Sequence, residues 1–218
     1  RESYYFPDYL ADLDQLLDHY SPQQPVSLVG HSMGGIVACL YAGVRPERVS
    51  KLVSIEGFGL AATQPEQAPA RLKRWLDEQR QPQTFHTHAD LTTIAQRLRK
   101  NNPRLSDDQA QFLAPWLAQQ TSNGAVYRAD PRHKLVNPLL YRLEEAKACW
   151  RAITAPTLWV QSDAPFLQAM LKETPEQTAE RKACFAQLQE VVISDSGHML
   201  HHDQPQALAS ELMRFLQG

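Results

Sequence analysis

Residues 30–34 read Gly30-His31-Ser32-Met33-Gly34, a Gly-x-Ser-x-Gly pentapeptide whose surroundings decide the fold. A short apolar run at residues 26–29 precedes it, and a longer one at residues 36–42 follows it. The first run is typical of a strand buried on both faces, and the second is typical of a buried helix. The sequence therefore predicts a strand, a sharp turn and a helix, which is the context of a nucleophile elbow.

The turn itself makes a demand on its residues. We expect Gly30 and Gly34 to be required because the turn leaves no room for side chains. Ser32 is expected in a strained backbone conformation that lifts its hydroxyl clear of the sheet. The alternative is a glycine-rich turn in which Ser32 has no chemical role, and the rest of the chain must decide between the two.

The composition is that of an ordinary globular chain, with 218 residues, 43% hydrophobic content and a net charge of −2. This length allows one core with an inserted subdomain. The densest basic cluster, Arg71, Lys73 and Arg74, is followed by Asp77 and Glu78, which indicates a solvated helix face and no nucleic-acid partner. No apolar stretch approaches the ~18 residues that span a bilayer, and we expect no signal peptide at the aromatic and polar start.

Three cysteines, Cys39, Cys149 and Cys184, stand at unrelated spacings. An odd number without a ligand pattern argues against a disulfide framework and against a zinc site. We therefore expect no metal and a reducing, cytoplasmic location.

The order of apolar runs predicts an α/β fold, with flanking helices around a parallel sheet. Strands at 26–29 and 49–55, joined by a helix at 35–44, form a βαβ unit and are expected to be parallel neighbours. The next strands are expected at 157–161 and 191–193. The intervening stretch of about a hundred residues exceeds any crossover and must be a subdomain. Helices are expected from Asp8 to Tyr20, at 71–78, 91–99, 106–116 and 143–153, and after Pro205, with an irregular connector at 123–141.

A serine hydroxyl is a poor nucleophile unless a base takes its proton, so Ser32 predicts a histidine and an acid. The best histidine is His198, which follows Ser196-Gly197 between the last strand and the last helix. His201 and His202 begin that helix, and we expect them to support the site or to lie at the surface.

The pentapeptide followed by Gly35, the helical insert and the late Ser196-Gly197-His198 together resemble the α/β-hydrolase superfamily over the whole chain. The resemblance implies a core at residues 1–58 and 147–218, with a helical cap at 59–146 above the pocket. It also implies a serine hydrolase without cofactor, which acts through an acyl-enzyme on a small or medium apolar, ester-like substrate. Relatives that act on halides or epoxides have an aspartate in the place of Ser32. Four apolar residues are candidates for the pocket, although residues of this kind at helix spacing more often serve packing: Phe58, Leu60, Trp75 and Trp116.

Two carboxylates compete for the role of the acid. Most members place it on a Gly-x-x-Asp turn after the strand that follows the cap, where this chain has Asp163 about two residues early and no glycine. The haloalkane-dehalogenase-like branch instead places a glutamate at the end of the strand after the nucleophile, where this chain has Glu56. A buried glutamate needs a partner, which a histidine supplies. Glu56 is favoured and Asp163 is the alternative. A purely structural role is also open to Glu56, in which its carboxylate accepts the backbone amides of the turn at 57–59.

The oxyanion hole of this superfamily takes one amide from the residue after the nucleophile, here Met33, and one from an earlier loop. That loop and the strands before it have no counterpart in this sequence. We therefore expect a sheet of four parallel strands with the Ser32 strand at its edge, as in the C-terminal part of a hydrolase. We also expect this chain to be weakly active or inactive, because losing one oxyanion donor costs about 10²–10³ in rate. Three alternatives stay open: a non-catalytic binding module, a cofactor-free haloperoxidase-like or oxygenase-like enzyme, and a subunit completed by a separate N-terminal piece.

Overall fold

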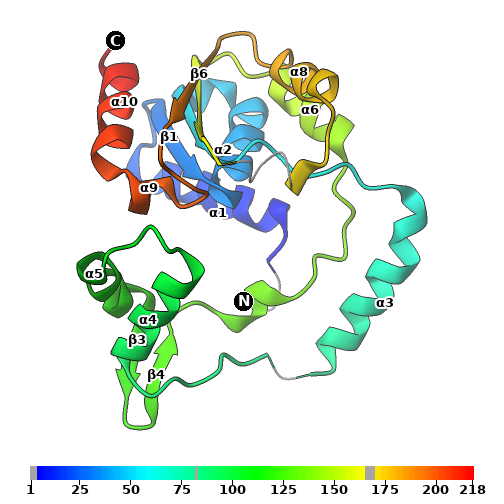
Figure 1. Ribbon diagram of the computed structural model, residues 1–218. Coiled ribbons are helices and arrows are strands. Elements are labelled where there is room, and N and C mark those ends of the chain that lie inside the picture. Colours follow the sequence, from blue (N-terminus) through cyan, green and yellow to red (C-terminus); the bar gives the residue numbers. More distant parts are fainter. Residues whose placement is uncertain (1–3, 82, 165–169) are drawn as a thin grey trace.

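The computed structural model describes residues 4–81, 83–164 and 170–218, and its core is a parallel β-sheet (Figure 1). The strands lie in the order β1-β2-β5-β6. Their bounds are β1 (Val26–His31), β2 (Val49–Ile55), β5 (Thr157–Ser162) and β6 (Leu188–Ile193). Each neighbouring pair is parallel, which confirms the predicted α/β fold with a sheet of four parallel strands.

Helices cover both faces of this sheet because its strands are apolar on both faces. On one face pack α1 (Phe6–Tyr20), α2 (Met33–Val44), α6 (Leu143–Arg151) and α8 (Pro175–Lys182). Their core includes Leu17, Tyr41, Leu52, Trp150 and Trp159. On the other face α10 (Pro205–Gln217) packs through Leu208 and Phe215 onto Val53, Leu158 and Val160 (Figure 1). The short α9 (Leu200–Asp203) precedes it.

The strand that carries the pentapeptide lies at an edge of the sheet. Within the described ranges β1 is hydrogen-bonded to β2 alone, and Val29 in its middle is 46% exposed. The predicted edge position of this strand is therefore confirmed. An apolar edge of this kind is a surface onto which a further strand can add.

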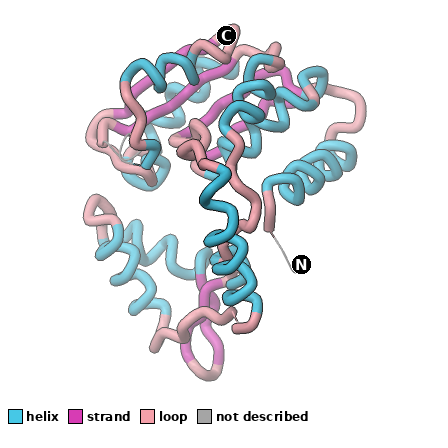
Figure 2. Tube along the Cα trace, turned by 90° about the vertical axis from the view of Figure 1, so that its right-hand side faces the viewer, coloured by secondary structure: helices cyan, strands magenta, loops and turns pink. Residues whose placement is uncertain are grey.

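The insert (residues 59–142) is the part of the predicted 59–146 cap that precedes α6. It contains α3 (Ala68–Gln79), α4 (Leu91–Asn101), α5 (Asp107–Leu117), β3 (Ala118–Thr121) and β4 (Gly124–Tyr127). Short 3-10 turns occur here at Pro65–Gln67 and Pro131–Lys134, and in the core at Pro46–Arg48. A small core of Ile94, Ala95, Ala110, Ala114 and Ala125 joins α4, α5 and the hairpin. Figures 1 and 2 both show these elements gathered apart from the sheet. No helix in the described part of the chain has the length and apolarity to cross a membrane.

The antiparallel hairpin β3–β4 corrects the expected irregular connector from residue 123 onward. Ser122 and Asn123 form its two-residue loop, and Gly124 follows with a positive φ of 124°. A β-carbon on Gly124 would lie 2.2 Å from the carbonyl oxygen of His88, so the close approach of these backbones requires glycine. The strand pattern was missed because β3 reads Ala-Gln-Gln-Thr, which has no apolar alternation.

Candidate active site

The backbone of Ser32 is strained in the way the pentapeptide predicts. Ser32 adopts φ 52° and ψ −119° between the end of β1 and the start of α2. Its N–H donates to the carbonyl of Ile55 at 2.8 Å, and its own carbonyl accepts from Ile36 N–H at 3.1 Å. A non-glycine residue at positive φ costs of order 1–3 kcal/mol and persists only where its surroundings impose it. The strand and the helix impose it here, and they hold Ser32 at the carboxyl edge of the sheet.

Only one of the two glycines of the pentapeptide is required by space. A β-carbon on Gly30 would lie 2.3 Å from the carbonyl oxygen of Gly34, which is part of the backbone and cannot turn away. A β-carbon on Gly34 would meet nothing within 4 Å, so the expectation that Gly34 is required is wrong. The second crowded position is Gly35, where a β-carbon would lie 2.6 Å from Ser54 Oγ.

Ser32, His198 and Glu56 lie in a row. The hydroxyl of Ser32 is 3.0 Å from Nε2 of His198, and Nδ1 of the same ring is 3.4 Å from Glu56 Oε2. Each residue comes from a different segment: Ser32 follows β1, Glu56 follows β2, and His198 lies in the histidine loop (residues 194–199) after β6. Because parallel strands end at one edge of a sheet, these segments meet there.

Glu56 is buried, at 2% exposure, and its carboxylate is held from both sides. Oε1 accepts hydrogen bonds from the backbone N–H of Ser162 at 2.7 Å and from its hydroxyl at 3.2 Å. Oε2 is then directed to His198. Removing a carboxylate from water costs several kcal/mol unless hydrogen bonds and an opposite charge compensate it. Ser162 supplies the hydrogen bonds, and a protonated His198 would supply the charge.

Asp163, the alternative acid, lies in another position. Its Oδ2 accepts from Asp195 N–H at 2.8 Å, and its Oδ1 accepts from Ser196 N–H at 3.1 Å. These two backbone hydrogen bonds hold the pKa of Asp163 below its ordinary value. Asp163 therefore ties the histidine loop to the end of β5, and its two oxygens point to backbone amides.

Sequence reasoning missed a contact of His31, although this residue lies inside the pentapeptide. His31 Nε2 is 2.6 Å from the backbone carbonyl oxygen of His198, so the ring donates this hydrogen bond. Burial lowers the pKa of His31 and favours its neutral form. The rings of His201 and His31 meet edge to face at 4.5 Å, and burial lowers the pKa of His201 to about 4. No group of three metal-ligating side chains within the described ranges is arranged to hold an ion.

The four candidate pocket residues have different surroundings. Phe58 is 1% exposed and stacks on Trp159 at 4.0 Å, so it belongs to the core. Trp116 is 71% exposed, and Trp75 is half-buried on α3. Leu60 lines an apolar cavity of about 580 Å³ between α1, α2 and α6, but neither Ser32 nor His198 is among its described lining residues.

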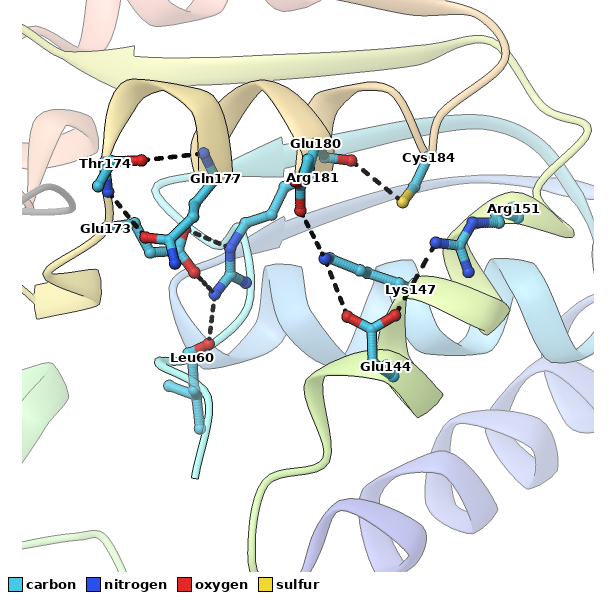
Figure 3. A network of polar contacts seen from close by, with 10 residues as sticks. All are labelled: Leu60, Glu144, Lys147, Arg151, Glu173, Thr174, Gln177, Glu180, Arg181 and Cys184. Carbon is cyan, nitrogen blue, oxygen red and sulfur yellow. Dashed lines mark hydrogen bonds and ion pairs between the residues drawn. The ribbon is translucent and has the colours of Figure 1, made fainter. Parts of the chain in front are cut away.

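The segment after Glu56 is held by a buried arginine of α8 (Figure 3). Arg181 is fully buried, and its guanidinium donates to the carbonyls of Phe58 at 3.2 Å and Leu60 at 2.8 Å. The same guanidinium forms a bidentate ion pair with Glu173, in which Nε lies 2.6 Å from Oε2. Figure 3 shows the guanidinium facing both Glu173 and the carbonyl of Leu60, beside the ion pairs of the buried Lys147 with Glu144 and Glu180. Arg181 therefore fixes the backbone where the core passes into the insert, at Phe58 and Leu60.

The chain has clear relatives. The sequence model of the alpha/beta hydrolase fold matches residues 1–205. A zebrafish (Danio rerio) serine hydrolase-like protein is 26% identical over 98% of this chain and 67% of its own length. A Dictyostelium discoideum serine hydrolase-like protein is 26% identical over 97% of this chain, which spans 61% of that relative. The thioesterase domain from the curacin biosynthetic pathway superposes with a TM-score of 0.82 at 31% identity, covering 97% of this chain and 74% of the thioesterase. The chain belongs to the α/β-hydrolase-fold family.

Proposed function

We propose that this chain carries the catalytic triad of a serine hydrolase, with Ser32 as nucleophile, His198 as base and Glu56 as acid. The observation that supports this proposal most is the Ser32 hydroxyl 3.0 Å from His198 Nε2, on an elbow with positive φ. A hydroxyl and an imidazole within hydrogen-bond reach, with the other ring nitrogen facing a carboxylate, form the arrangement that activates a serine.

Each side chain then has a defined task. His198 Nε2 accepts the proton of Ser32 as Oγ attacks the carbonyl carbon of the substrate. Glu56 keeps the imidazole in the tautomer with its proton on Nδ1, and it stabilises the imidazolium that forms. His198 next gives the proton to the leaving group, which leaves an acyl group on Ser32. A water molecule activated by the same imidazole releases the acid.

The oxyanion of the tetrahedral intermediate needs hydrogen-bond donors. Met33 follows the nucleophile and begins α2, so its N–H is one of the amides that the helix leaves without an intrahelical acceptor. We assign this amide as one oxyanion donor. A donor of this kind contributes about 10²–10³ to the rate.

The substrate class that we propose is an ester or thioester of a small or medium apolar acyl group. A serine at the elbow favours acyl transfer, and the likeness to a thioesterase domain at 31% identity supports including thioesters. We further propose that the insert covers the pocket as a cap.

The three thiols are free in the structure, which suits a reducing compartment such as the cytoplasm.

Labelling with a fluorophosphonate probe tests the proposal directly. The probe reacts with activated serines, and mass spectrometry of the digested chain locates the adduct. We expect the adduct on Ser32 and its loss in Ser32→Ala and in His198→Gln. The matched control is Ser27→Ala, which removes an exposed serine hydroxyl from the same strand and should leave labelling unchanged.

Two results would overturn the proposal. One is an adduct on a different serine that survives Ser32→Ala. The other is no adduct on a chain whose circular dichroism shows it to be folded, which would favour a binding module on the hydrolase fold.

A further inference from the structure

Asp203, outside the triad, bridges two distant parts of the chain. Its Oδ2 accepts the N–H of Gly197 at 2.8 Å, directly before His198. Its Oδ1 accepts from the side-chain amide of Asn102 at 2.6 Å, in the turn between α4 and α5 of the insert. Gly197 is buried, and both Asn102 and Asp203 are half-buried. One carboxylate therefore holds the histidine loop with one oxygen and the insert with the other.

The orientation of the Asn102 side chain is fixed by its own turn. Its Oδ1 accepts the backbone N–H of Arg104 at 3.2 Å, so its NH₂ group must face Asp203. The backbone N–H of Asn102 in turn donates to Leu98 at the end of α4. The amide is thus a rigid extension of the insert.

Further contacts lie on either side of this bridge. Gln109 of α5 donates through Nε2 to the carbonyl of His202 at 3.1 Å. The Arg104 guanidinium lies beside Gly197, where an added β-carbon would be 3.1 Å from Nη1. Figure 1 shows the α4–α5 turn next to α9, in agreement with these contacts.

We propose that Asp203 is a positioning residue that couples the insert to His198, so that the α4–α5 turn helps to set the position of the imidazole. The expected effect on the reactivity of Ser32 rests on the proposed triad. The bridge of hydrogen bonds through Asp203 does not depend on that proposal. His31 and Asp163 hold other backbone groups of the same loop from the sheet side. Asp203 is hydrogen-bonded to both sides, so through it the position of the insert can reach the loop.

A charge-conserving exchange of the two side chains tests the coupling. In Asn102→Asp two carboxylates face each other. In Asp203→Asn the introduced NH₂ group can face the NH₂ group of Asn102, and neither can accept. In the double variant the amide introduced at position 203 can accept from Gly197 and donate to the carboxylate introduced at position 102. We expect each single variant to slow probe labelling of Ser32 about tenfold, because small displacements of a catalytic group cost up to 10². The double variant should return to within about threefold of the unaltered chain.

Hydrogen exchange gives a readout that needs no catalysis. In each single variant the amides of residues 194–200 should exchange faster, and in the double variant they should return to the original rate. Asn101→Asp is the matched control, because it adds the same charge one residue away at an exposed position, and it should change neither readout.

The outcomes separate this inference from the proposed function. An unaltered chain that is not labelled contradicts the triad, while exchange still tests the bridge. The coupling is overturned if the exchange rates of residues 194–200 do not change in Asn102→Asp. It is also overturned if the labelling rate of the double variant falls by the combined effect of the two single variants.

Discussion

The carboxylate of Glu56 lies 3.4 Å from Nδ1 of His198, while its other oxygen is held by the backbone amide of Ser162. Asp163, the next residue along the chain, instead receives the amides of Asp195 and Ser196. The two carboxylates left as alternatives by the sequence therefore have separate positions. One faces the imidazole, and the other holds the loop that carries it.

This separation predicts different effects for the two isosteric substitutions. Glu56→Gln should lower the rate of fluorophosphonate labelling at Ser32 by about 10²–10⁴, because an amide no longer favours the required tautomer or the imidazolium. Asp163→Asn should lower it less than about tenfold and should mainly reduce the melting temperature. Labelling rates and thermal melts of both variants check this. Loss of labelling in Asp163→Asn, with Glu56→Gln unaffected, would reverse the assignment.

The elbow glycines should also respond differently to substitution by alanine. Gly30→Ala places a β-carbon 2.3 Å from a backbone oxygen, and we expect at least about 2 kcal/mol of destabilisation and loss of labelling at Ser32.

Gly34→Ala has free space and lies in the first turn of α2. It should be neutral or stabilise by up to about 1 kcal/mol, with labelling within a few-fold of the unaltered chain. Urea melts measure both variants. An equal loss of stability would show that room at the turn is not what distinguishes the two positions.

The features that could be predicted from the sequence are those with a local pattern. The strands of the sheet are apolar runs, such as residues 49–55, and their order along the chain leaves few parallel arrangements. The elbow and the histidine loop follow from residue types that stand together at 30–34 and at 196–198. These segments meet because parallel strands share one carboxyl edge.

The features that were missed depend on contacts between distant residues. Nothing near Asp163 in the sequence indicates that its partners are amides of residues 195 and 196. Phe58 carries the same apolar signal whether it lines a pocket or stacks on Trp159. The bridge from Asn102 to Asp203 spans 101 residues, and neither side chain belongs to a pattern that a local rule detects.

The buried arginine of Figure 3 gives a prediction about stability. Arg181→Met should destabilise the chain by about 3–5 kcal/mol, because it leaves the carboxylate of Glu173, at 9% exposure, buried without its partner. The carbonyls of Phe58 and Leu60 also lose their donor. Chemical denaturation of the variant gives the size of the effect.

A double variant separates the unpaired charge from lost packing. Arg181→Met combined with Glu173→Gln removes the buried charge, and it should recover a large part of the lost stability. Lys73→Met, which breaks an exposed pair with Asp77 on α3, is the control and should change stability little. A double variant no more stable than Arg181→Met alone would place the cost in the loss of the carbonyl contacts.

The histidines around the site predict loss of stability in acid. Burial lowers the pKa of His201 to about 4, from 6.5 when unfolded, and it lowers the pKa values of His31 and His202 in the same direction. Between pH 6.5 and 4 the unfolded chain therefore binds more protons than the folded chain at these sites. The free energy of unfolding therefore has its full value, as far as these histidines are concerned, above pH 6.5. It decreases as the pH falls toward 4, because protons then bind preferentially to the unfolded chain.

His201→Gln removes one of these titrations and should flatten the dependence of unfolding free energy on pH within this window. The expected gain over the unaltered chain near pH 4 is about 1–2 kcal/mol, after the pKa shift is discounted for partial exposure of the ring. Little difference is expected at pH 7.5 beyond a constant offset. His19→Gln, at an exposed position on α1, is the control and should keep the original slope. Urea melts at several pH values measure this, and equal slopes in all three chains would show that His201 gains its proton as readily in the folded state as in the unfolded one.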